Sequence, residues 1–227
     1  CVYAKRFIYR IETMTYLQLV NAVLRRLRES EVTSVSQNTY SALIGELVNQ
    51  SKRYIENAVN WSGLRSDITF NTADDDFTYT LTGATDRSTV LDVINDTSNK
   101  RLSYKTPYEF KNFKNIATSS KGSPSFFTFN GFDGVNTQVD VHPTPDGVYS
   151  LIFTVAKRPV DLSSDSDTIL VPTAPVIEYA HALAARERGE TGGTSAAELF
   201  RLADVTLSDA AAFDQAKNPE ELVFRTI

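Results

Sequence analysis

The chain has 227 residues, of which 41% are hydrophobic, including thirteen Phe and ten Tyr, so it can form a core in one large domain or two small ones and is not disordered as a whole. Its single cysteine, Cys1, excludes an intrachain disulfide and a cysteine-based metal cluster, and no run of about 18 apolar residues could span a membrane. The net charge of −5 at pH 7 argues against a protein that grips DNA or an anionic membrane, but not against a surface that DNA slides past.

The first 13 residues are basic and aromatic and precede the only methionine, Met14. They lack the continuous apolar stretch of a signal peptide. Because an amphipathic helix is predicted to begin directly after Met14, we expect residues 1–13 either to lie upstream of the natural start or to form an N-terminal extension outside the main fold.

Two amphipathic helices are predicted next. The first runs from Thr15 to Arg28, because a capping box, T-x-x-Q, opens it and apolar residues then recur every three or four positions. The polar linker EVTSVSQN precedes a longer helix from about Thr39 to Trp61, with Gly63 expected as its left-handed C-terminal cap. The short connection favours an antiparallel pair.

From Ser66 to Pro172 the apolar period changes from 3.6 residues to 2, which indicates strands. Two hairpins are predicted where alternating segments flank NTADDD and NDTSNK. A third is predicted around HPTPDG, because apolar residues alternate on both sides of this Pro-Asp-Gly turn. TPYEFKNFKN is compatible with a short helix, and TILVP reads as a final strand.

Helical periodicity returns after Pro172. Pro175 suits the first turn of a helix that should end at Gly189. A second helix, with apolar residues from Leu199 to Phe213 on one face, stops before Pro219. The last ten residues, NPEELVFRTI, look like an extended arm with an apolar centre.

This order predicts an α+β fold: a discontinuous helical bundle, with two N-terminal and two C-terminal helices, carries an inserted antiparallel β-sheet or sandwich domain. The predicted boundaries are 14–65 plus 173–217 for the helical domain, 66–172 for the β-rich domain and 218–227 for a C-terminal docking arm, after the extension 1–13. Helices from both ends of the chain are expected to share one layer, because each apolar stripe needs a partner.

Few residues form a pattern suited to catalysis or metal binding. His142 and His181 lie far apart in the sequence, and His181 has no second ligand at metal spacing. The acidic runs DDD at 74–76 and DLSSDSD at 161–167 lack the EF-hand pattern and are interpreted as solvated connections. No nucleophile elbow, P-loop or G-x-G-x-x-G motif is present. We therefore expect no enzyme activity, no metal and no cofactor.

A basic cluster of Arg25, Arg26 and Arg28 lies off the apolar stripe of the first helix, near its C-terminal end. One interpretation is contact with DNA or with an acidic partner surface. The other, which we favour, is a solvated helix end whose positive charge complements the helix dipole.

Three stretches follow one another in a characteristic order. They are MTYLQLVNAVLRRLRESEVTSV, GSPSFFTFNG with VHPTPDGVYSLIFTVAKRPVDL, and ILVPTAPVIEYAHALAARERGE. In this order they resemble the head-to-tail adaptor proteins of tailed bacteriophages, the family that includes the tail tubular protein A, or gatekeeper-ring subunit, of T7-like phages. With the helix SAAELFRLADVTLSDAAAF, the resemblance spans about Met14 to Phe213.

The resemblance implies a structural virion protein of the phage neck or tail, assembled in the host cytoplasm and without catalysis. Such proteins form a homo-oligomeric ring, usually twelve-fold, below the portal protein. They join the portal to the tail nozzle or next tail protein and surround a channel through which DNA is ejected without specific binding. Here the C-terminal arm would dock on the portal or a neighbouring copy, through Leu222, Val223, Phe224, Arg225 and Ile227.

Two other interpretations stay open: a β-sandwich recognition module of a tail fibre or surface ligand-binding protein, and a hydrolase. A recognition module would stay monomeric or trimeric and bind a glycan. A hydrolase would lose activity when a histidine is replaced. An adaptor would form rings or associate with the portal.

Overall fold

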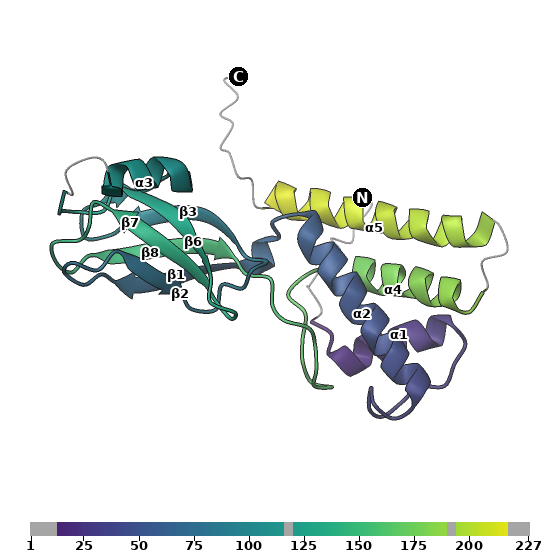
Figure 1. Cartoon of the computed structure of the whole chain (residues 1–227). Helices are drawn as coiled ribbons and strands as arrows, with labels where there is room; N and C mark the ends of the chain where they lie inside the picture. Colours follow the sequence, from purple (N-terminus) through teal and green to yellow (C-terminus); the bar gives the residue numbers. More distant parts are fainter. Residues whose placement is uncertain (1–12, 116–119, 190–193, 218–227) are drawn as a thin grey trace, which may run out of the picture. The chain divides into compact units, whose positions relative to one another are not determined.

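The computed structural model describes residues 13–115, 120–189 and 194–217. Within them are five α-helices, one 3-10 turn and eight strands, and the chain divides into two compact units (Figure 1). The β unit is Leu64–Pro159, and the helical unit draws on the chain before and after it. This confirms the predicted α+β fold with an inserted β domain. None of the described helices is both long and apolar enough to cross a bilayer.

The helical unit contains four helices. They are α1 (Tyr16–Arg26), α2 (Thr39–Ala58), α4 (Thr173–Glu187) and α5 (Thr194–Lys217). The predicted capping box opens α1, where the Thr15 hydroxyl accepts the Gln18 N–H and Gln18 Oε1 accepts the Thr15 N–H. The predicted end of α4 is also confirmed, because Gly189 adopts a left-handed conformation with φ 71°.

Helix α4 is the centre of the helical unit and packs against α1, α2 and α5 (Figure 1). The helix is rich in alanine, and Ala180, Ala182 and Ala184 have no exposed surface. Small side chains let neighbouring helices approach closely, since interaxial distance depends on the side chains at the contact. Helices from both ends of the chain therefore share one core.

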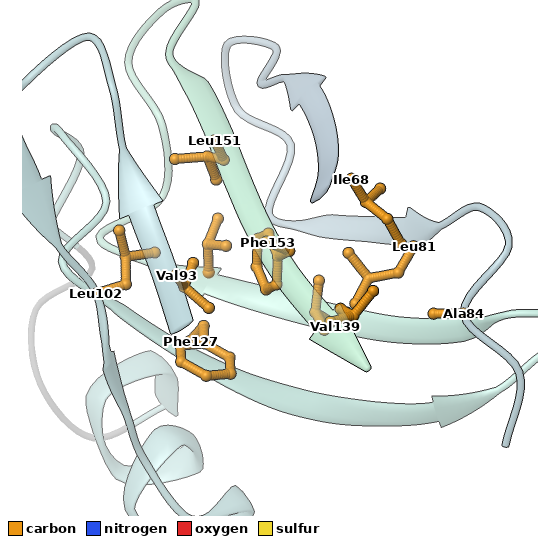
Figure 2. Close-up of a cluster of buried hydrophobic side chains, with 11 residues drawn as sticks. Ile68, Leu81, Ala84, Val93, Leu102, Phe127, Val139, Leu151 and Phe153 are labelled. Atoms are coloured by element: carbon orange, nitrogen blue, oxygen red, sulfur yellow. The ribbon is translucent and has the colours of Figure 1, made fainter. Parts of the chain in front are cut away.

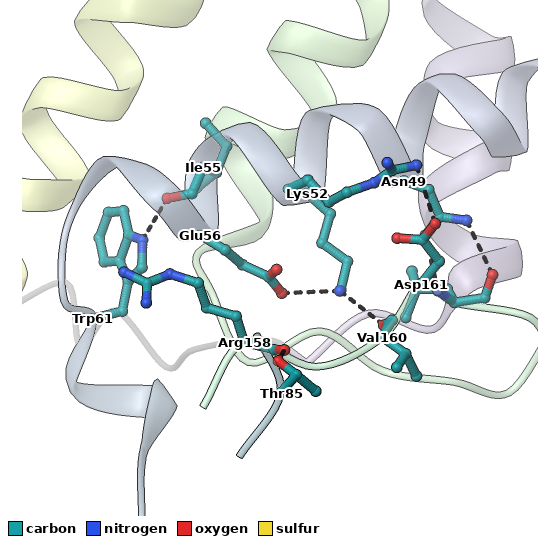
Figure 3. Close-up of polar contacts among 11 residues, drawn as sticks. Asn49, Lys52, Ile55, Glu56, Trp61, Thr85, Arg158, Val160 and Asp161 are labelled. Atoms are coloured by element: carbon teal, nitrogen blue, oxygen red, sulfur yellow. Dashed lines mark hydrogen bonds and ion pairs between the residues drawn. The ribbon is translucent and has the colours of Figure 1, made fainter. Parts of the chain in front are cut away.

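The segment from Val160 to Pro172 belongs with the helices, although its sequence pattern grouped it with the strands. The Asn49 amide bonds both backbone groups of Leu162, at 3.0 Å to the carbonyl oxygen and 2.8 Å from the N–H (Figure 3). Lys52 Nζ donates to the Val160 carbonyl oxygen at 3.0 Å. These buried side chains of α2 hold the returning chain against the helical unit.

The TILVP stretch does not form the predicted strand. Its only ladder contact in the described chain is an isolated antiparallel bridge between Thr168 and Thr15. Just before it, the Asp167 carbonyl oxygen accepts the Tyr16 N–H at 2.7 Å. The Asp165 carbonyl oxygen likewise accepts the Leu17 N–H at 3.2 Å, so the residues just before the stretch pair with the start of α1.

The β unit consists of two four-stranded sheets, ordered β1-β8-β3-β4 and β2-β7-β6-β5. The strands are β1 (Arg65–Asn71), β2 (Thr78–Leu81), β3 (Thr89–Asn95), β4 (Lys100–Arg101), β5 (Ser103–Tyr104), β6 (Phe126–Phe132), β7 (Thr137–His142) and β8 (Ser150–Ala156). Neighbouring strands are antiparallel except β5 and β6, which are parallel.

The core of the β unit is built by alternation along its strands (Figure 2). Leu151, Phe153 and Val155 of β8 are buried, as are Val139 and Val141 of β7. Successive side chains in a strand point to opposite faces, so each of these sets lies on one face of its own sheet. The two sheets therefore share a single apolar layer.

Only one of the three predicted hairpins is present. Strands β3 and β4 pair around NDTSNK, with Ile94 opposite Arg101. NTADDD and HPTPDG instead join strands that belong to different sheets. Pro143 and Pro145 supply no ladder donors, which favours a change of sheet at this point. The two connections also bond to each other, because the Asp75 N–H donates to the Pro145 carbonyl oxygen at 3.0 Å.

Two further local expectations have different outcomes. The compatible short helix is present as α3 (Pro107–Asn115), which packs on β6 and β7. Gly63, by contrast, does not adopt the predicted left-handed cap and lies in the 3-10 turn Ser62–Leu64. A Cβ at Gly63 would collide with the Leu170 carbonyl oxygen. The glycine is therefore needed for a close backbone approach, not for a positive φ.

Candidate interaction surfaces

The predicted basic cluster at the end of α1 is largely neutralised. Arg25 Nη1 lies 2.8 Å from Glu31 Oε1, and Arg26 Nη2 lies 2.7 Å from Glu178 Oε1 of α4. The Arg25–Glu31 pair is exposed, and such pairs stabilise a fold by about 0–1 kcal/mol. The two arginines therefore orient the end of α1 against its surroundings and offer little free positive charge.

Arg28 differs from its two neighbours. It has φ 59°, in the left-handed region. The helix ends in a Schellman motif, in which Arg28 N–H donates to the Arg25 carbonyl oxygen and Glu29 N–H to the Leu24 carbonyl oxygen. Glycine is the usual residue at this position because it has no Cβ. Arg28 is exposed, and among the described residues no carboxylate pairs with its guanidinium.

The predicted docking residues of the C-terminal arm, Leu222, Val223, Phe224, Arg225 and Ile227, lie outside the described residues, as do residues 1–12 of the predicted extension 1–13. The arm follows directly on α5, which ends at Lys217.

Helix α5 presents an exposed apolar face beside its buried one. The predicted stripe included Leu202, Ala203 and Phe213, but only Ala203 of these three is buried. Leu202 and Val205 are each 50% exposed. The difference arises because α5 packs mainly on α4 and so buries a narrower face than a helix enclosed on two sides.

Aromatic rings form a ladder across α2, α4 and α5. The rings of Tyr54 and Tyr179 stack with centroids 4.4 Å apart, and Tyr179 meets Phe200 edge-on at 5.6 Å. The Arg186 guanidinium lies 5.4 Å from the centroid of Phe200. Burial raises the pKa of Tyr179. Tyr54 is 43% exposed and Arg186 is exposed, so the ladder ends at the surface.

The β unit carries an aromatic and basic edge at β5. The exposed rings of Tyr104 and Phe129 contact each other with centroids 5.7 Å apart. The stretch KRLSYKTPYEFKNFK, residues 100–114, contains five Lys or Arg and one Glu, a net charge of +4 in an otherwise acidic chain. Arg101 of this stretch pairs with Asp92 at 3.1 Å, and Lys105 Nζ lies 3.9 Å from Glu109 Oε1. Exposed aromatic residues with the remaining positive charge favour binding of an acidic partner.

The two histidines lie in different surroundings. His142 stacks on Phe113 with centroids 5.5 Å apart and packs edge-on against Phe110, and burial lowers its pKa. His181 is a half-buried residue of α4. Across 13–115, 120–189 and 194–217, no three His, Cys, Asp or Glu side chains gather as metal ligands would.

The fully buried ion pair of α2 gave little signal in the sequence. Lys52 Nζ lies 2.9 Å from Glu56 Oε1, and both side chains have no exposed surface (Figure 3). The spacing i, i+4 is typical of exposed helix pairs. The one indication of burial was the position of Lys52, which lies between Ser51 and Ile55, two members of the predicted apolar stripe.

One comparison with known proteins identifies a family. The family model described as SU10 adaptor protein matches residues 14–220. The match covers α1 through α5 and the inserted β unit together. No curated protein matches the chain.

Proposed function

The chain belongs to the SU10 adaptor protein family, a family of structural head-to-tail adaptors of phages, and we propose that it forms the ring that joins the portal to the tail. The match over residues 14–220 is the observation that carries the proposal. The ring lies below the portal, in the neck of the virion, and surrounds the channel for DNA ejection. A twelve-fold ring, as in the resembling adaptors, is part of the proposal.

The two units suit two different partners. The helical unit is proposed to face the portal and the β unit to face the tail nozzle or next tail protein. The exposed pair Tyr104 and Phe129 supports a tail-facing role for the β5 edge, as does the excess of basic residues in the stretch 100–114. The net charge of −5 supports passage of DNA through the ring without specific binding.

Within the basic cluster, Arg28 is proposed to be the residue that binds an acidic surface of a partner. Arg25 and Arg26 are already paired with carboxylates. A non-glycine residue with positive φ is costly and persists where its side chain is needed. Arg28→Gly and Arg28→Ala should both weaken portal binding, whereas Arg25→Ala should change it less.

The arm is proposed to dock on the portal or on a neighbouring copy. Leu222, Val223 and Phe224 supply apolar anchors, and a short apolar segment gains most of its stability from a partner. A chain truncated after Lys217 should melt like the full chain but bind portal more weakly. Unchanged portal binding by the truncated chain would refute the role of the arm.

Portal binding tests the function as a whole. The full chain is mixed with the portal protein of the same phage and analysed by size-exclusion chromatography with light scattering. Co-elution as a complex containing many copies of the chain is expected. A chain that stays monomeric beside assembled portal would overturn the proposal.

A further inference from the structure

Resting on the proposed ring, we infer that neighbouring copies join through two surfaces of the helical unit: an acidic aliphatic flank of helix α5 in one copy binds the aromatic ladder and Arg186 of the next. The acidic aliphatic flank consists of Glu198, Leu202, Val205 and Asp209. The aromatic basic flank consists of Tyr54, Tyr179, Phe200 and Arg186. Both belong to the helical unit.

The acidic aliphatic flank is a continuous surface. Its four residues follow at intervals of four, three and four positions, which places them on one face of a helix. All four are exposed, and the two aliphatic side chains are each 50% exposed. A carboxylate thus lies at each end of an apolar centre, a composition suited to a partner that offers an apolar ring and a cation.

The aromatic basic flank has that composition. Tyr54 stacks on Tyr179 and remains 43% exposed. The exposed guanidinium of Arg186 lies over the ring of Phe200, and no carboxylate among the described residues pairs with it. Aromatic rings and arginine are the residue types most enriched at the centres of protein interfaces.

On α5 itself, the one member of the aromatic basic flank points away from the acidic aliphatic flank. Phe200 and Leu202 are two residues apart, and each helical residue turns the direction by about 100°. Leu202 therefore points roughly 200° away from Phe200. A contact between unlike surfaces of identical chains is heterologous, and it generates a closed ring when the rotation between neighbours closes. Two separate surfaces of the helical unit therefore allow each copy to bind one neighbour through each.

Charge decides between this occupant and others. Glu198 and Asp209 outnumber Arg201, the exposed cation beside this flank, so two acidic aliphatic flanks would repel each other, which disfavours a symmetric contact. A cation is instead required opposite them, and Arg186 supplies one beside exposed aromatic surface. A copy of the same chain therefore carries both halves of the contact.

Charge reversal tests the contact. Asp209→Lys and Arg186→Glu should each weaken assembly with portal at least tenfold, and the chain carrying both changes should recover most of the loss. Asp86→Lys, which reverses an exposed carboxylate of the β unit, is the matched control and should assemble normally. Thermal melting of each variant separates loss of the contact from loss of folding.

Cross-linking gives a readout that does not depend on stability. In a Cys1→Ser background, Tyr54→Cys and Val205→Cys chains are mixed with portal and treated with a short bis-maleimide. A cross-linked dimer between the two variants is expected, because each chain carries only one thiol. As a control, a Val148→Cys chain, whose cysteine lies at an exposed site of the β unit, takes the place of the Val205→Cys chain. No cross-linked dimer should then form.

The outcomes separate this inference from the proposed function. If the wild-type chain assembles with portal but both charge reversals assemble normally and no cross-link forms, the α5 contact is overturned and the adaptor function stands. A contact of α5 with portal instead would appear as a chain–portal cross-link and would also overturn the inference. If the wild type never assembles, both are overturned.

Discussion

The ammonium nitrogen of Lys52 lies 2.9 Å from a carboxylate oxygen of Glu56 one helical turn later, and neither side chain has any exposed surface. Lys52 also donates to the Val160 carbonyl oxygen at 3.0 Å, where the chain returns from the β unit. Lys52 thus connects α2 to the returning chain.

Lys52→Met should therefore destabilise the helical unit by about 3 to 5 kcal/mol, because it leaves a carboxylate and a carbonyl without this partner in the interior. Trp61, the only tryptophan and buried in the helical unit, reports the unfolding by fluorescence in denaturant. Arg25→Met, which breaks an exposed pair, is the control and should cost about 0–1 kcal/mol. Equal losses in the two variants would contradict the account.

Gly45 allows α1 and α2 to cross closely. A Cβ at this position would collide with the Tyr16 hydroxyl and lie 2.7 Å from Val35 Cγ1. Gly45→Ala should therefore destabilise the helical unit by about 1 to 3 kcal/mol, as overpacking does, although alanine is the better helix former.

The same change in a Tyr16→Phe background tests the cause. Removing the hydroxyl removes the closest obstacle, so the cost of Gly45→Ala should shrink there. Trp61 fluorescence in denaturant measures all four chains. A gain in stability from Gly45→Ala alone would show that the crossing is looser than described.

Arg28 holds a conformation that glycine adopts more easily. Arg28→Gly should stabilise the helical unit by about 0.5 to 1 kcal/mol. The change removes the conformational energy that an L-residue pays in the left-handed region, and glycine's greater freedom in the unfolded chain offsets part of that gain. Arg28→Ala keeps the Cβ and should bring no such gain. Denaturation midpoints measure both variants. Equal midpoints for Arg28→Ala and Arg28→Gly would show that the left-handed conformation of Arg28 carries no such cost.

His142 should make the β unit sensitive to mild acid. Burial lowers the pKa of His142, so below the ordinary value of about 6.5 the unfolded chain binds a proton that the folded chain does not. The free energy of unfolding should therefore decrease as the pH falls from about 6.5 to the lowered pKa of His142 in the folded chain. Below that lowered pKa, His142 should cause no further decrease. Melting curves by near-ultraviolet circular dichroism, compared with His142→Phe, measure the difference. Parallel pH profiles for the two chains would exclude this role.

Local signals in the sequence predicted the helices well. The Thr15 capping box and the Gly189 stop involve neighbouring residues, so their chemistry is visible within a few positions. The residues of HPTPDG indicate that the chain reverses direction, and this favours a hairpin. They do not determine which strand the next one pairs with. Strand β8 pairs with β1 and β3, which are distant in the sequence, and this pairing buries Leu151, Phe153 and Val155.

The interaction surfaces were predictable only in part. The basic residues of α1 were visible, but their partners Glu31 and Glu178 were not, because one lies beyond the helix and the other on α4. The exposed face of α5 was hidden in a single apolar stripe. Only the packing of α5 on α4 shows that Ala203 is enclosed while Leu202 is exposed.

Electron microscopy of the purified chain with its portal tests the central claim most directly. The adaptor account predicts rings of this chain, seen end-on and seated on one face of the portal in side views, with the subunit number of the portal. Portal particles without added density, beside a chain that remains monomeric, would contradict it.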